Sequence, residues 1–139
     1  MAVREISIAL EDTPGKLSEM ADCLRENGIT ILGLSVAKRA DVTAVRLVTT
    51  DPEKAANTLR THAYAITEKE VIGVEVPDHP GGLNAVLRPL KERSIEIRSL
   101  YTCFGPGDKT LLIMDVDRVS DAVLALQKNW VRVLNGSDQ

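Results

Sequence analysis

The sequence predicts an α+β fold in which one βαββαβ unit occurs twice. Three observations support this. The two halves of the chain align with each other, strand-like and helix-like segments follow in the same order in each half, and the composition of 44% apolar and 27% charged residues is that of a globular protein. The chain has 139 residues, so each repeated unit is small. Small units bury a limited share of their surface, so we expect the two units to pack together or to oligomerise.

The internal repeat emerges when Asp12 is aligned with Asp78. The same alignment pairs Pro14 with Pro80, Gly15 with Gly81, Leu17 with Leu83, Leu24 with Leu90, Glu26 with Glu92, Ile29 with Ile95, Ile31 with Ile97 and Leu34 with Leu100. Repeated matches at one offset indicate a duplicated structural unit. We therefore predict two domains, residues 1–69 and 70–139, without a Gly/Ser-rich linker at their boundary.

The first half begins with residues 3–10, whose alternating apolar side chains predict a strand. Apolar residues at helical spacing follow and predict a helix. This helix should end near Asn27 and Gly28, a pair that is typical of a helix C-cap. The apolar positions of this helix are Leu17, Met20, Ala21 and Leu24. Two strands, 29–38 and 43–50, are expected next.

A second helix in this half should begin with Asp51 as the N-cap and Pro52 as the first helical residue. A short closing strand is predicted at 65–70. The second half repeats the order. Its predicted strands are 71–76, 95–104, 109–116 and 130–135, with a turn at "GPGD", and its helices carry the apolar positions Leu83, Val86, Leu87 and Leu90, and Val119, Ala122, Val123 and Leu126.

This order with right-handed crossovers gives a ferredoxin-like arrangement, an antiparallel sheet with two helices on one face. Residues 111–116 place apolar side chains on both faces of their strand, so both faces are expected to be buried. Packing between the repeats or between subunits is the simplest cover for the second face.

The turns "DTPGKL" (12–17) and "DHPGGL" (78–83) join the first strand to the first helix of each half. With proline as the first helical residue, Asp12 or Thr13 would cap one helix and Asp78 or His79 the other. A helix start offers free N–H groups to an anion, and glycine lets a ligand approach the backbone. Together with the aspartate, such a turn suits a zwitterion. The same residues also make a good strand-to-helix turn without any ligand, and duplication preserves either role.

Other classes of function receive little support. The net charge of −3 gives no basic surface for nucleic acid, and no segment approaches the roughly 18 apolar residues of a membrane span. The start of the chain does not resemble a signal peptide, so we expect a cytoplasmic protein. Cys23 and Cys103 lack metal-site or disulfide spacing, and no cofactor motif occurs.

Catalysis is not expected, because the chain contains only His62 and His79 and none of the common catalytic motifs. Acylphosphatase shares the topology but would need an arginine in the first turn, where this chain has Lys16. An RNA-recognition domain would stack bases on aromatic residues of its central strands. Tyr101 and Phe104 lie on one such strand, but the strand "KTLLIMDV" has no aromatic residue.

The element order, the two turns and the later segments "NGITILGLS" and "RSIEIRSLY" resemble a tandem ACT-domain protein over nearly the whole chain. The resemblance implies a non-catalytic regulatory module that binds a small amino acid at the interface between ACT units and signals through altered packing. It places the ligand contacts on the first turn and on the start of the second strand of a neighbouring unit. Here these residues are Asp12, Thr13, Pro14, Gly15, Lys16, Leu17, Thr30, Ile31, Asp78, His79, Pro80, Gly81, Gly82, Leu83, Glu96 and Ile97.

The two copies differ at implied contacts. Thr30 aligns with Glu96, and Lys16 aligns with Gly82. The second turn has two glycines, so we expect more room at its backbone and a better site, where Glu96 could help Asp78 to hold an ammonium group. We expect a homodimer and a metabolic enzyme as a possible partner. The alternative is a protein-interaction module without a ligand, which assembles as the regulatory subunit of a separate enzyme.

Overall fold

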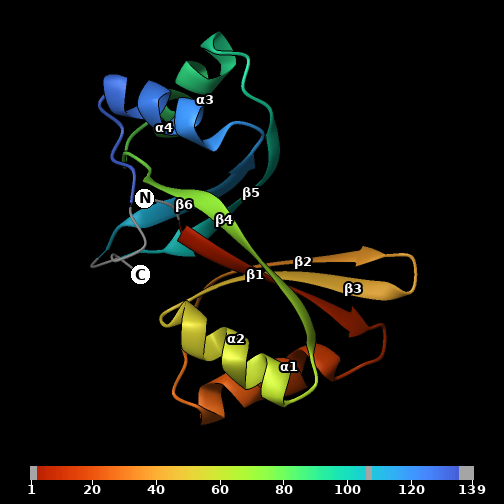
Figure 1. The fold of residues 1–139 in the computed structure, drawn as a ribbon. Helices are drawn as coiled ribbons and strands as arrows, with labels where there is room; N and C mark the ends of the chain where they lie inside the picture. The colour runs from red at the N-terminus through yellow and green to blue at the C-terminus, as the bar shows by residue number, and fades with distance from the viewer. Residues whose placement is uncertain (1–2, 106–107, 135–139) are drawn as a thin grey trace. The chain divides into compact units, whose positions relative to one another are not determined.

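The structure is a computed structural model that describes residues 3–105 and 108–134. Its elements are β1 (Val3–Glu11), α1 (Lys16–Glu26), β2 (Ile31–Arg39), β3 (Val42–Thr49), α2 (Pro52–Thr61), β4 (Ala65–Glu75), α3 (Gly82–Glu92), β5 (Ile97–Phe104), β6 (Thr110–Val116) and α4 (Val119–Lys128) (Figure 1). The predicted α+β class and the repeated βαββαβ order are confirmed. The turn predicted at "GPGD" lies in part outside the described residues.

The described residues form two compact units, which we call the first unit (Arg4–Lys69) and the second unit (70–134 with Val3). Strand β4 is continuous from Ala65 to Glu75, whereas separate strands were predicted at 65–70 and 71–76. No glycine or proline interrupts residues 65–72, so the extended backbone continues. The predicted strand at 130–135 was also too long, because its described part forms only an isolated antiparallel bridge, between Val133 and Val74.

In the first unit, β3 pairs antiparallel with β1 on one side and β2 on the other. Helices α1 and α2 lie on one face of these strands (Figure 1). Apolar side chains from the strands and both helices form a buried core between them. Its residues are Ile6, Ile8, Leu10, Met20, Leu24, Ile29, Val45, Leu47, Ala55, Ala56 and Leu59. Residues 65–69 lie near β1, where Glu68 pairs with Arg4 at 3.3 Å.

In the second unit, β6 pairs antiparallel with β4 and β5, and α3 and α4 cover one face (Figure 1). The core contains Ile72, Val74, Val86, Leu90, Ile95, Leu112, Met114, Val116, Ala122, Leu126 and Val131. All residues from Leu111 to Val116 are buried, as predicted for a strand with two covered faces. On the second face, a Cβ at Gly73 would lie within 4 Å of Val3, Ile113 and Leu134, so these side chains meet there.

The helix that follows each repeated turn begins two residues later than the proline rule predicts. Pro14 lies in the turn, Gly15 is the N-cap with φ 89°, and α1 starts at Lys16. The second copy behaves alike, since Gly81 is the N-cap with φ 87°. A left-handed glycine after the proline turns the chain into the helix, so the proline itself stays outside.

The predicted side-chain caps on these two helices are therefore wrong. Neither helix has a side-chain hydrogen bond at its cap, so Asp12, Thr13, Asp78 and His79 do not have that role. By contrast, α2 follows the prediction: Pro52 is its first residue, and the Asp51 carboxylate accepts the Lys54 N–H at 3.1 Å.

The end of α3 is stabilised by Arg118, the N-cap residue of α4 in the same unit. The sequence "RS" at 93–94 lacks a glycine, and Ser94 adopts φ 55°. The Arg118 guanidinium donates to the carbonyls of Arg93 and Ser94 at 2.7 and 2.9 Å. The Arg93 carbonyl belongs to the C-cap of α3, one of the positions that a helix end leaves without intrahelical donors, and Ser94 follows it. In the first unit Asn27 and Gly28 end α1 as predicted.

Both cysteines are free and buried, and burial raises the pKa of the Cys103 thiol to about 11. Because the unfolded thiol has a pKa of 9.0, the folded state keeps its proton over a higher pH range. The free energy of unfolding should therefore fall as the pH rises from about 9 to 11. We expect Cys103→Ala to show a shallower fall than the unmodified chain in urea unfolding measured across this range. Equal slopes for the two proteins would contradict the assignment.

Candidate functional site

The turn of the first unit presents a carboxylate, an open glycine and the first N–H groups of α1. The Thr13 N–H donates to the Glu11 carbonyl at 2.9 Å, and the Lys16 N–H to the Thr13 carbonyl at 3.4 Å. The next N–H groups, of Leu17 and Ser18, belong to the first helical turn, which has no intrahelical acceptors for them. A Cβ at Gly15 would have no neighbour within 4 Å, so the backbone is accessible there.

Asp12 forms an ion pair that sequence reasoning missed. Its Oδ2 lies 2.9 Å from the Lys38 Nζ, and the two side chains are 38% and 69% exposed. The hydrogen bond to the Asp12 carboxylate, followed by its charge, raises the pKa of Lys38. The pairing arises because Lys38 and Leu10 flank the same residue of β3, Thr43. Only the strand register could have revealed it.

The turn of the second unit has a similar backbone but a different electrostatic environment. His79 donates its N–H to the Pro77 carbonyl at 3.0 Å, and the Gly82 N–H donates to the His79 carbonyl at 3.0 Å. The His79 Nδ1 lies 2.9 Å from the Pro80 carbonyl oxygen. Within the part of the chain that the structure describes, the exposed Asp78 carboxylate has no ion pair or hydrogen bond.

The two glycines of this turn differ in what surrounds them. A Cβ at Gly81 would have no neighbour within 4 Å, as at Gly15. A Cβ at Gly82 would lie 2.0 Å from the Pro77 carbonyl oxygen. The room that we expected from the double glycine is therefore open at Gly81 only, because the backbone of the turn itself fills the space at Gly82.

The predicted strand contacts lie at the opposite end of α1 or α3 from the turn of the same unit. Thr30 precedes β2, and its N–H donates to the Thr50 Oγ1 at 3.2 Å. Glu96 precedes β5 in the same way, with its N–H donating to the Asp117 Oδ1 at 3.1 Å. An 11-residue helix is about 16 Å long, so one unit does not bring its turn and its strand start together.

Glu96 also has its own cation. Its Oε1 lies 3.8 Å from the Arg98 Nε, and its side chain is 71% exposed. Ile31 and Ile97, the next predicted contacts, are partly buried and pack against the cores of their units. Of these two predicted carboxylates, Asp78 is therefore the one without a neighbouring cation among the described residues.

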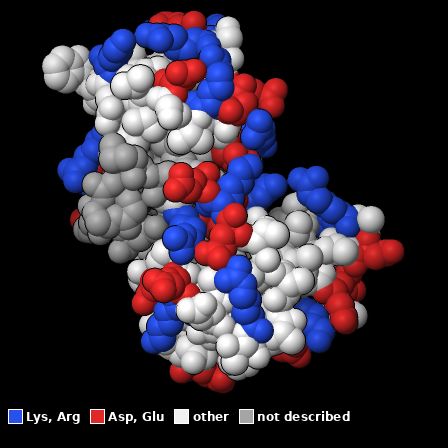
Figure 2. Space-filling view, in the orientation of Figure 1, with Lys and Arg blue, Asp and Glu red and all other residues white. Residues whose placement is uncertain are grey.

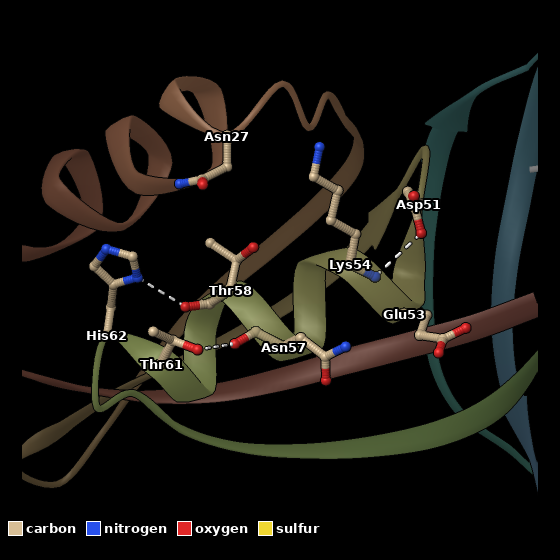
Figure 3. A pocket seen from close by; sticks show the side chains of 8 residues that line it. All are labelled: Asn27, Asp51, Glu53, Lys54, Asn57, Thr58, Thr61 and His62. Carbon is tan, nitrogen blue, oxygen red and sulfur yellow. Dashed lines mark hydrogen bonds between the residues drawn. The ribbon is translucent and has the colours of Figure 1, made fainter.

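A cavity of about 460 Å³ lies elsewhere in the first unit, beside α2 and the end of α1 (Figure 3). It is lined by Asn27, Asp51, Glu53, Lys54, Asn57, Thr58, Thr61 and His62. Several of these side chains bond to the backbone of their own helix, such as Thr61 to the Asn57 carbonyl at 2.8 Å (Figure 3). None of the residues predicted to bind a ligand lines this cavity.

The described residues were also searched for metal-ligand clusters, membrane-spanning helices and one-sided surface charge. They contain no group of three or more His, Cys, Asp and Glu that could hold a metal ion. None of their helices has the length and the apolar content that crossing a membrane requires. Basic and acidic side chains are interspersed on the face that Figure 2 shows.

Comparison with solved structures identifies similar chains of known fold. Protein BT0572 from Bacteroides thetaiotaomicron is 28% identical with a TM-score of 0.90, and the match covers 99% of this chain and 95% of that one. The ligand-free regulatory subunit of aspartate kinase from Thermus thermophilus is 12% identical with a TM-score of 0.67, covering 94% of each chain. Its counterpart from Thermus flavus is 13% identical with a TM-score of 0.61 and the same coverage.

A search of curated proteins found no match. A family model described as an ACT domain pair matches residues 1–136. The repeated element order, the paired turns and this match over nearly the whole sequence agree, and the chain belongs to the family of ACT domain pairs.

Proposed function

We propose that this ACT domain pair is a non-catalytic regulatory module that binds a small amino acid at its first turns and signals through altered packing. The Asp12–Lys38 pair is the observation that carries the proposal. An alkylammonium group already sits 2.9 Å from the aspartate of one turn, beside a helix start with available N–H groups. A free amino acid offers an ammonium and a carboxylate for the same two features.

The site would be completed by a second ACT unit. Because the turn and the strand start of one unit lie at opposite ends of its first helix, a ligand that contacts both kinds of residue needs a strand start from a different unit. Thr30 or Glu96 and the following isoleucine would provide that second side. Occupancy would then change how ACT units pack, which is how a module without catalytic groups could signal.

The regulated partner is proposed to be a separate metabolic enzyme in the cytoplasm, with the module acting as a homodimer. Two of the similar structures are regulatory subunits of aspartate kinase, but their identities of 12% and 13% establish a common fold alone. The regulatory role therefore rests on membership of the family of ACT domain pairs, and the enzyme has to be identified by binding experiments.

A thermal-shift screen against the standard amino acids, each at millimolar concentration, tests the proposal. A ligand at 100 times its dissociation constant stabilises the folded state by about 2.7 kcal/mol, which raises the melting temperature by several degrees. The N-acetyl derivative of the active amino acid lacks the ammonium group and should give no shift. Absence of a shift with every amino acid would contradict the proposal.

A protein-interaction module without a ligand is the second candidate, and exposed apolar residues favour it. Phe104 is 77% exposed and Trp130 is 95% exposed, while Leu34 and Val36 are 43% and 44% exposed. Leu34 and Val36 lie two residues apart on β2 and therefore project to the same face, and neighbouring exposed apolar side chains are typical of contacts with another protein. If no amino acid stabilises the chain but a metabolic enzyme binds it, this second function would replace the first.

A further inference from the structure

The two turns differ most in the charge that faces their aspartates. The Asp12 carboxylate is held by the Lys38 ammonium at 2.9 Å. The Asp78 carboxylate has no such partner among the described residues. The backbone conformations of the two turns are alike, with Gly15 at φ 89° and Gly81 at φ 87°. The difference therefore lies in the side chains around the turn.

Strand register shows which residue replaces Lys38 in the second unit. Lys38 pairs with Thr43, which also pairs with Leu10, two residues before Asp12. Phe104 pairs with Thr110, whose carbonyl accepts the Val76 N–H at 3.0 Å, and Val76 lies two residues before Asp78. Phe104 thus occupies the place of Lys38.

The side chains of Lys38 and Phe104 also share one face of their sheets. Residues paired across antiparallel strands project to the same face. Val36 pairs with Val45 of the first core, and Lys38 lies two residues further along β2. Thr102 pairs with Leu112 of the second core, and Phe104 lies two residues further along β5. Phe104, 77% exposed and uncharged, cannot neutralise Asp78.

We infer that Lys38 is a built-in substitute for the ammonium group of the ligand, so that the turn of the first unit is self-occupied and the turn of the second unit is the one that takes a free amino acid. This inference rests on the proposed function. A tethered ammonium that spans the site correctly acts at an effective concentration in the millimolar range or above. A free amino acid at millimolar concentration would have to displace Lys38 from Asp12. At Asp78 it would not have to displace any side chain of the described residues.

Backbone amide NMR can report on each turn separately. The unmodified chain is titrated with each standard amino acid, and the Gly15 and Gly81 resonances are followed. We expect the Gly81 amide resonance to shift until binding of the amino acid is saturated, while the Gly15 amide resonance stays near its starting position. In Lys38→Ala the Gly15 resonance should respond at concentrations at least about 10-fold lower than in the unmodified chain. In Phe104→Lys the Gly81 response should need at least about 10-fold more ligand.

Matched variants separate the charge effect from other consequences of substitution. Arg39→Ala removes the exposed cation that follows Lys38 on β2. In this variant the Gly15 resonance should still not respond to the amino acid. Phe104→Leu removes the aromatic ring without adding charge and should preserve most of the Gly81 response. Equal responses of Gly15 and Gly81 in the unmodified chain, or an unchanged Gly15 in Lys38→Ala, would overturn the inference and leave the proposed function standing. No response at either turn in any protein would overturn both.

Discussion

Replacing Gly82 by alanine should lower the free energy of unfolding by about 2–4 kcal/mol. The new Cβ would lie 2.0 Å from the Pro77 carbonyl oxygen and 3.0 Å from its carbon. Both are backbone atoms, so relief requires movement of the turn itself, which also carries the hydrogen bond from the Gly82 N–H to the His79 carbonyl. Urea unfolding of Gly82→Ala and the unmodified chain measures the difference.

Lys16→Ala is the matched control, because Lys16 aligns with Gly82 and already carries a Cβ. It loses only an exposed ion pair with Glu19 at 3.5 Å, so its free energy of unfolding should change by less than about 1 kcal/mol. If Gly82→Ala were as stable as Lys16→Ala, the close approach of Pro77 would not constrain this turn.

Replacing Asp78 by asparagine should weaken the binding of an amino acid at least about 10-fold, since hydrogen bonds to charged groups contribute roughly 1.5–3 kcal/mol. The substitution preserves the shape of the side chain and removes the charge that we propose faces the ligand's ammonium. Asp78 is exposed and lacks a partner among the described residues, so the melting temperature without ligand should stay unchanged. Titration calorimetry with the amino acid that stabilises the unmodified chain provides the measurement.

Asp12→Asn is the corresponding change in the other turn. Because Lys38 already holds the Asp12 carboxylate, this variant should bind the amino acid nearly as tightly as the unmodified chain. Equal binding by Asp78→Asn and the unmodified chain would remove Asp78 from the site.

The element order could be predicted because periodicity is a local signal. Apolar side chains alternate at Ile6, Ile8 and Leu10 and recur at helical spacing in the following segment, because one face of each element packs on the core. The strand and the helix that these two patterns predict were both confirmed. Strand ends were less predictable. The division of 65–76 into two strands came from the repeat, but no residue near Lys69 interrupts the extended backbone.

Proline positions show where a local rule needs its context. Pro52 begins α2 because Asp51 before it accepts a hydrogen bond from the helix. Pro14 and Pro80 precede glycines with positive φ, so their helices begin beyond the glycine. The sequence "PG" contained this information, since a left-handed glycine cannot be part of the helix itself.

The candidate site could be predicted only in part. The turn residues follow from the repeat, whereas the Asp12–Lys38 pair depends on the register of β2 and β1 across β3. The contact of Gly82 with Pro77 depends on the path of the turn, and the pairing of Glu96 with Arg98 depends on side-chain conformation. Sequence alone could propose the members of the candidate site, but it could not show which of their charges are already paired.

Direct binding of free amino acids to the unmodified chain tests the central claim. Isothermal titration calorimetry should show saturable binding of at least one amino acid, with a dissociation constant at or below the millimolar range, and no binding of its N-acetyl derivative. Heats that never saturate for any amino acid would contradict the account.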